Sequence, residues 1–145
     1  MTTADRAYAL VTEEPLSVES LARVVSRPSA GAIVTFQGTT RDVDSLEYEA
    51  YREMAEEKIA AIVAEAIERH GLEAAAAEHR IGTVPREEAS VVVAAAAAHR
   101  GEAFAGAREI IDRIKAEAPI WKKEIEGGDV RWVEGTRAGG DDRRS

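Results

Sequence analysis

The order of structural elements is clearest in GAIVTFQGTTRDVDSLEYEAYREMAEEKIAAIVAEAIERH, residues 31–70. Side chains of opposite character alternate in residues 31–40 and again in residues 46–51, which is typical of β-strands with two different faces. Because only a short segment separates these strands, they are predicted to pair as a β-hairpin. Residues 53–70 then repeat apolar side chains at helical spacing, and Gly71 follows as a natural helix stop.

The sequence on either side continues the pattern of strands and helices. Before this stretch, residues 6–12 favour a strand, and Ser17 is placed to cap a helix. After it, we expect two strands, a helix and two further strands at residues 74–84, 89–100, 101–117, 119–125 and 130–134. The side chains expected to form the buried stripes of the three helices are Leu21, Val24, Val25, Met54, Ile59, Ile62, Val63, Ala66, Ile67, Phe104, Ala107, Ile111 and Ile114.

Paired strands separated by single helices predict an α+β fold with a largely antiparallel sheet and three main helices. The chain has 145 residues, enough for one domain with a substantial core. We expect a single domain over residues 1–134. The glycine-rich, charged residues 135–145 are expected to be a disordered tail.

The charge of the chain is uneven. Its formal net charge is −8, which argues against general binding to nucleic acids or membranes. Residues 99–123 nevertheless carry six Lys or Arg side chains against four Asp or Glu. This local excess of positive charge favours a small anionic ligand.

Several classes of protein are disfavoured by what the sequence lacks. It contains no cysteine, so disulfides and thiolate metal sites are excluded, and any sulfur that it handles must be carried by another molecule. No apolar run is long enough for a membrane helix, and the N-terminus does not resemble a secretion signal. A cytoplasmic protein without a metal ion or cofactor is therefore expected.

The basic residues of this region offer two readings. Lys115, in the last turn of the expected helix, can be a solvated lysine that interacts with the helix dipole, or a partly desolvated base or nucleophile near Lys122 and Lys123. Lys122 and Lys123 alternate along a strand, so the pattern does not say which one faces inward. His99 and Arg100 precede a helix N-terminus, where they can be solvated or can bind an anion.

Two further basic positions are weaker candidates. The His79–Arg80 dipeptide resembles the pair at 99–100, but a structural role is favoured for it. Arg41 lies at the expected hairpin tip, where an arginine is usually just solvated. Motifs for phosphate loops, dinucleotides, zinc or a Ser-His-Asp triad are not evident.

Taken together, the sequence resembles the MoaE family, the large catalytic subunits of molybdopterin synthase. The matching stretches are GAIVTFQGTTRD, LEYEAYREMAEEK, HRIGTVP, the HR pair at 99–100, IDRIKAEAPIWKKE and RWVE. They span roughly residues 30 to 134, in the order found in the family. The resemblance implies an α/β-hammerhead-like fold and a homodimer.

The resemblance also implies a partner and a reaction. Each large subunit would bind a small ubiquitin-like subunit that carries a thiocarboxylate on its C-terminal Gly-Gly. Sulfur would pass from that tail to cyclic pyranopterin monophosphate, and two transfers would create the dithiolene of molybdopterin. A Gly-Gly tail has no side chains, so it can thread a narrow channel.

The site residues follow from the same resemblance. Lys115 is similar to the essential lysine of the family and Lys122 to its second active-site lysine, which makes both candidates for catalysis. Lys115 would be an acid or base, or would form a transient covalent link. The expected substrate-binding residues are His99, Arg100, Arg41, Phe36, Ile111, Lys123 and Arg137.

Two departures from the family pattern bear on these roles. The segment between Arg41–Asp42 and LEYEAY is shortened here to residues 43–45. Arg137 stands one position away from where the family often supplies an arginine from the partner protomer. A non-catalytic anion-binding module, or an inactive relative that still binds the small subunit, therefore remain alternatives to the enzyme.

Overall fold

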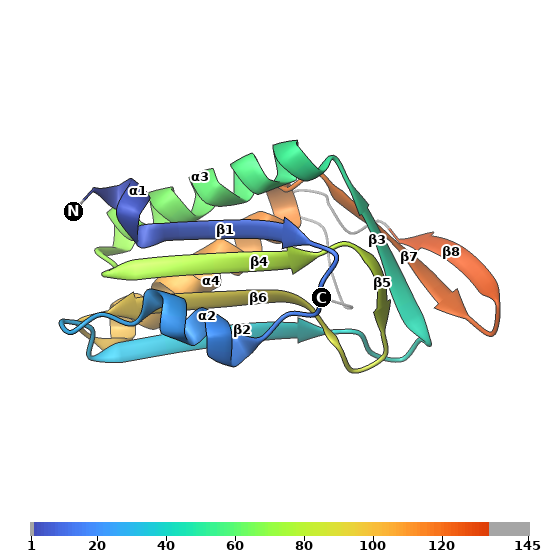
Figure 1. Ribbon diagram of the computed structural model, residues 1–145, viewed down its shortest axis with the longest axis horizontal. Coiled ribbons are helices and arrows are strands. Elements are labelled where there is room, and N and C mark those ends of the chain that lie inside the picture. Colours follow the sequence, from blue (N-terminus) through green and yellow to red (C-terminus); the bar gives the residue numbers. More distant parts are fainter. Residues whose placement is uncertain (1, 134–145) are drawn as a thin grey trace.

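The computed structural model describes residues 2–133, which form two four-stranded β-sheets (Figure 1). The helices are α1 (Thr3–Arg6), α2 (Val18–Val25), α3 (Arg52–His70) and α4 (Arg100–Glu117). The strands are β1 (Ala7–Thr12), β2 (Ala32–Thr39), β3 (Ser45–Ala50), β4 (Ala74–Arg80), β5 (Gly82–Pro85), β6 (Ala89–Ala97), β7 (Ile120–Glu126) and β8 (Asp129–Val133).

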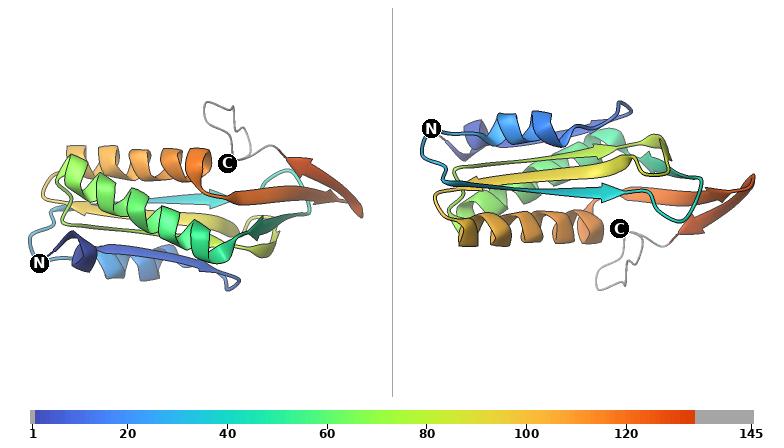
Figure 2. Two further views of the ribbon diagram at one scale, coloured as in Figure 1. Left: turned by 90° about the horizontal axis from the view of Figure 1, so that it is seen from above. Right: turned by 90° about the horizontal axis from the view of Figure 1, so that it is seen from below.

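The first sheet has the strand order β1-β4-β6-β2, and the second has the order β5-β3-β7-β8. The β1–β4 pair is parallel and the other pairs are antiparallel. In Figure 2, α3 and α4 lie on one face of the first sheet and α2 lies on the other, while the second sheet projects from one end. The prediction of an α+β fold with three main helices and largely antiparallel sheets is confirmed.

Both faces of the first sheet are buried, which explains the unusual strand composition. Residues 74–77 of β4 and 94–97 of β6 are all alanines with at most 1% of their surface exposed. Small side chains let helices pack closely on the sheet, and the larger residues come from the helices, as with the fully buried Ile59, Ile62 and Ile110. Burying one such isoleucine stabilises the fold by roughly 2 kcal/mol.

The helix ends agree with their sequence signals. The Ser17 hydroxyl accepts a hydrogen bond from the Ser20 amide at 3.2 Å and so caps α2. Gly71 ends α3 with a φ of 63°, in the left-handed region that favours glycine. No helix among residues 2–133 is long and apolar enough to cross a membrane.

The predicted hairpin between residues 31–40 and 46–51 is wrong. Strand β2 pairs with β6 in the first sheet, whereas β3 pairs with β5 and β7 in the second. The connection crosses between the sheets because it bonds to other segments: the Thr40 amide donates to the Glu88 carbonyl at 3.1 Å, and the Asp44 amide donates to the Ile125 carbonyl at 3.1 Å. Arg41 therefore lies in a link between two sheets and not at a hairpin tip.

A second expected strand is divided in the same way. Residues 74–84 were expected to form one strand, but they separate into β4 and β5 on either side of Ile81. Gly82 has a φ of 84°, which redirects the chain from the first sheet to the second.

Three residues expected in the buried helix stripes are exposed instead. Val24, Met54 and Phe104 expose 42%, 60% and 62% of their surface. The predicted tail at residues 135–145, with Arg137, lies outside the described residues.

Candidate active site

A hollow of about 430 Å³ lies between α4 and β2 and brings three predicted site residues together. Strand β2 is an edge strand of the first sheet, so one side of the hollow is open. Phe36, Ile111 and Lys115 were expected at the site and all line this hollow. The complete lining is Val34, Thr35, Phe36, Phe104, Ala107, Arg108, Ile111, Asp112 and Lys115.

Lys115 lies in the last turn of α4, and its position follows from the local sequence. The helix ends at Glu117 because Pro119 follows, and the Ala118 amide closes the last turn by donating to the Ile114 carbonyl at 3.0 Å. Lys115 is half-buried beside the apolar wall formed by Ile111. A lysine amine in such a setting can bind an anion in its protonated form, or react as a base or nucleophile in its neutral form.

An ion-pair network joins α4 to α3, and its α4 members, Arg113 and Glu117, stand two residues before and after Lys115 in the sequence. Arg113 bonds Glu117 and Glu65 at 2.8 Å each, and Lys58 lies 3.2 Å from Glu117. The hydrogen bonds to Glu117 from Arg113, and then from Lys58, lower the pKa of Glu117 to about 2. The network ties the C-terminal half of α4 to α3 and so limits movement of the helix that carries Lys115.

The structure distinguishes the two neighbouring lysines of β7. Lys122 is buried, with 4% of its surface exposed, and stands opposite Tyr48 of β3. Lys123 points to the other face, where its amine lies 3.1 Å from Glu49 and 4.6 Å from the centre of the Trp132 ring. Lys122 is thus the inward lysine, and Lys123 is paired with acidic and aromatic side chains outside.

The charges of Lys122 and of Lys115, which lines the hollow, both act on the buried side chain of His79. It is buried at the end of β4, and its ring meets Tyr48 edge-on with 5.0 Å between centroids. Burial, and then the charges of Lys115 and Lys122, lower the pKa of His79 to about 4. Both lysines therefore act on one buried imidazole, although they come from different elements.

The other predicted cations do not line the hollow. His99 and Arg100 are exposed at the opposite end of α4, roughly 22 Å along the helix axis from Lys115. Arg41 is largely exposed in the β2–β3 link, 4.0 Å from the carboxylate of Asp42. Arg137 lies outside the described residues.

Sequence reasoning missed the contribution of Tyr48 and His79. Tyr48 lies on the inward face of an alternating strand, and His79 had been assigned a structural role. The one available signal was the repetition of a His-Arg dipeptide at 79–80 and 99–100. That signal did not say which pair lies near the lysines.

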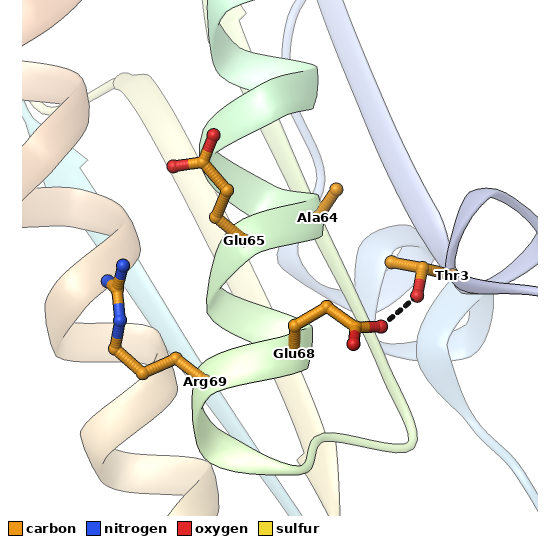
Figure 3. A pocket seen from close by; sticks show the side chains of 5 residues that line it. All are labelled: Thr3, Ala64, Glu65, Glu68 and Arg69. Atoms are coloured by element: carbon orange, nitrogen blue, oxygen red, sulfur yellow. Dashed lines mark hydrogen bonds between the residues drawn. The ribbon is translucent and has the colours of Figure 1, made fainter.

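A second hollow, of about 420 Å³, has no comparable chemistry (Figure 3). Its polar side chains are already bonded to protein groups: Glu68 accepts from the Thr3 hydroxyl, Arg69 donates to Glu109, and Glu65 accepts from Arg113. Within residues 2–133, no group of three or more His, Cys, Asp or Glu side chains is arranged to hold a metal ion.

Comparison with known families and sequences gives a consistent result. The sequence model of the family described as "MoaE protein" matches residues 11–117. A molybdopterin synthase catalytic subunit from Thermoplasma volcanium is 46% identical over 132 residues, covering 86% of this chain and 96% of the relative. One from Oryza sativa subsp. indica is 51% identical over 112 residues, covering 73% of this chain but only 58% of the relative's length.

Solved structures agree with the sequence comparison. The crystal structure of molybdopterin synthase from Staphylococcus aureus superposes with a TM-score of 0.81 at 34% identity, covering 86% of this chain and 95% of that one. A complex of subunits 1 and 2 of molybdopterin-converting factor from Helicobacter pylori 26695 has a TM-score of 0.75, covering 89% and 92%. Its identity of 18% supports a shared fold alone.

Proposed function

The chain belongs to the MoaE family, and from this premise we propose that it is the catalytic subunit of a molybdopterin synthase and acts as a sulfurtransferase. It takes sulfur from the thiocarboxylated Gly-Gly end of a small ubiquitin-like subunit and transfers it to cyclic pyranopterin monophosphate. Two transfers form the dithiolene of molybdopterin. The observation that carries this proposal is the position of Lys115 on an open apolar hollow, with buried Lys122 nearby.

The two lysines have different proposed tasks. Lys115 is half-buried at the hollow and acts as the acid or base, or forms a transient covalent link. Lys122 holds the phosphate of the substrate and stabilises the charge that develops during transfer. The absence of cysteine in this chain fits a sulfur atom that arrives on the partner.

The shape of the hollow supports entry of an extended tail. The hollow follows α4 from Phe104 to Lys115, a rise of roughly 16 Å, beside edge strand β2. An extended Gly-Gly segment is narrow and can hydrogen-bond to a free strand edge. The Helicobacter complex of two subunits is a precedent for such a partner within this fold.

The distance between the two basic groups supports a homodimer. His99 and Arg100 lie too far from Lys115 to hold the same small substrate within one protomer. We propose that they contribute to the site of a second copy, where Arg100 binds the substrate phosphate. Arg41 and Arg137 are proposed to join the binding residues of such a shared site, as are Phe36 and Ile111.

Mixed dimers test both the reaction and the shared site. Arg100→Ala and Lys115→Ala proteins are each combined with the thiocarboxylated small subunit and substrate, and then mixed with each other. Inactive single variants that regain product in the mixture support a site built from two protomers. Failure of the wild-type protein to bind the small subunit at micromolar concentration in size-exclusion chromatography contradicts the proposed function.

A further inference from the structure

The buried side chain of His79 lies within electrostatic range of both candidate lysines. The proposed reaction has so far given it no task. Only 7% of its surface is exposed. Its neighbours across the sheet are Val11 of β1 and Val91 of β6, both buried and apolar. On the side of the second sheet its ring meets Tyr48, 5.0 Å away with an interplanar angle of 71°. The ring is therefore held on three sides.

The hydrogen bond of His79 fixes its tautomer. Nδ1 lies 2.8 Å from the carbonyl oxygen of Arg80. A carbonyl oxygen only accepts, so Nδ1 carries the hydrogen and donates it. In a neutral ring the lone pair then belongs to Nε2, which makes no hydrogen bond to any residue in the range 2–133. His79 thus has one anchored nitrogen and one open acceptor.

The surroundings also keep the ring uncharged. Burial disfavours the imidazolium, and the positive charges of Lys115 and Lys122 disfavour it further, so that the pKa of His79 is lowered to about 4. Near neutral pH the ring is therefore a polar but neutral side chain within electrostatic range of the two lysines. A third cation at this position would add repulsion among the three basic groups.

We infer that His79 is a positioning residue of the proposed site: anchored through Nδ1, it supports Tyr48 opposite Lys122 and leaves Nε2 as an open, uncharged acceptor. Tyr48 and Lys122 are cross-strand partners, so a shift of the tyrosine ring changes the volume available to the lysine side chain. An open, neutral acceptor can take a hydrogen bond without adding repulsion to the charges of the lysines. This inference rests on the proposed function, because it gives the two lysines their catalytic tasks.

Two substitutions separate positioning from packing. His79→Phe keeps an aromatic ring against Tyr48 but removes both nitrogens, whereas His79→Gln keeps a polar group that can reach the position of Nε2. We expect kcat of His79→Phe to fall roughly tenfold to a hundredfold, since the Nδ1 anchor and the Nε2 acceptor are both lost, with a smaller change in KM. His79→Gln is expected to recover part of kcat.

The matched control is His70→Phe. His70 ends α3 and bonds Glu109 at 2.8 Å, on the side of the molecule that carries the α3–α4 ion pairs. The kcat of His70→Phe should therefore equal that of the wild-type protein. A folded His79→Phe protein with the kcat of wild type would overturn the inference and leave His79 a packing residue. A wild-type protein that binds the small subunit but forms no product would instead contradict the proposed function itself.

A spectroscopic measurement on the whole chain decides the state of the ring even where a variant fails to fold. Imidazole ¹⁵N–¹H correlation spectra of wild-type protein should give His79 as the neutral tautomer protonated at Nδ1 between pH 5.5 and pH 8, a range about one unit or more above its pKa. An imidazolium signal, or protonation at Nε2, within this range would overturn the inference, because Nε2 would then not be an uncharged acceptor.

Discussion

At the scale of single residues, the clearest contrast lies between two neighbouring lysines. Lys122 and Lys123 are chemically identical, but strand β7 turns one inward and the other towards Glu49. Their sequence pattern could not distinguish them, because alternation identifies two faces without saying which one is covered. The answer came from the pairing of β7 with β3, which sets Lys122 opposite Tyr48.

This contrast predicts unequal effects of the same substitution. Lys122→Met and Lys123→Met both remove a charge while keeping most of the side-chain volume. We expect Lys122→Met to lower kcat/KM by about a hundredfold or more, since it removes charge stabilisation at the site. Lys123→Met should lower kcat/KM by less than about tenfold. Steady-state kinetics with the small subunit in excess measures both. Equal losses would contradict the assignment of Lys122 as the inward lysine.

The buried His79 predicts how stability depends on pH. Its pKa is lowered from 6.5 to about 4 in the folded protein, so between these values the unfolded chain binds the additional proton. The contribution of His79 to the free energy of unfolding therefore decreases as the pH falls through this window, by roughly 1 kcal/mol per unit. Urea denaturation between pH 6.5 and pH 5 measures the slope.

The His79→Phe protein provides the comparison for this slope. Glu117 contributes at lower pH, since its pKa is lowered from 4.5 to about 2, so it does not obscure the window. Removing the imidazole should reduce the pH dependence by the share that belongs to His79. An unchanged slope in His79→Phe would mean that the ring is as easily protonated in the folded chain as in the unfolded one.

At the scale of elements, the close packing of α4 depends on the absence of a side chain at Gly106. A Cβ added at Gly106 would stand 2.7 Å from Cδ1 of Leu72, which is itself buried. We expect Gly106→Ala to destabilise the protein by roughly 1 kcal/mol, because overpacking exceeds the gain in helix propensity. Since α4 carries Lys115, activity should also fall.

Gly101 in the first turn of the same helix is the matched control. Nothing lies within 4 Å of a Cβ added there, so Gly101→Ala should stabilise the protein by about 0.5 kcal/mol. Chemical denaturation of both variants measures the difference. A destabilised Gly101→Ala beside an unaffected Gly106→Ala would contradict the close packing of α4 on Leu72.

The shortened β2–β3 link is held by hydrogen bonds to the β7–β8 turn. The Asp44 carboxylate accepts from the Gly127 amide at 2.8 Å and from Arg86 at 3.1 Å, and the Asp44 amide donates to Glu126 at 2.7 Å. These reciprocal bonds fix the two segments to each other. They also account for how so short a segment can leave one sheet and enter the next.

We expect Asp44→Ala to loosen this connection. Losing a net hydrogen-bond contribution of about 1 kcal/mol should accelerate hydrogen exchange at the Gly127 amide several-fold. Asp129→Ala removes a carboxylate from the same hairpin without touching the connection, so it should leave this rate unchanged. Equal exchange rates in the two variants would show that the Asp44 carboxylate does not hold the turn.

The order of elements was predictable, and the pairing of strands was not. Helix periodicity, the Ser17 cap and the Gly71 stop are local signals, and each was confirmed. The hairpin failed because alternation in β2 and β3 is compatible with any partner, and their true partners β6 and β7 lie far along the chain. Non-local pairing leaves little trace in a single sequence.

At the scale of the whole molecule, the candidate site collects residues from distant parts of the chain. Phe36 comes from β2, His79 from β4, Lys115 from α4 and Lys122 from β7. The sequence identified the lysines because basic residues gather between 99 and 123 in an acidic chain. It also predicted that Arg100 and Lys115 stand at opposite ends of one helix, which is confirmed, but it could not predict that Tyr48 and His79 join the lysines.

The central claim is that Lys115 serves the chemistry of sulfur transfer. The most direct measurement is dithiolene formation from wild-type, Lys115→Ala and Lys58→Ala proteins, each combined with the thiocarboxylated small subunit and cyclic pyranopterin monophosphate. Lys58 is the matched control, since it pairs with Glu117 on the α3–α4 side and does not line the hollow. The account predicts product from wild type and Lys58→Ala, and none from a folded Lys115→Ala that still binds the small subunit. Product from Lys115→Ala at the wild-type rate would contradict it.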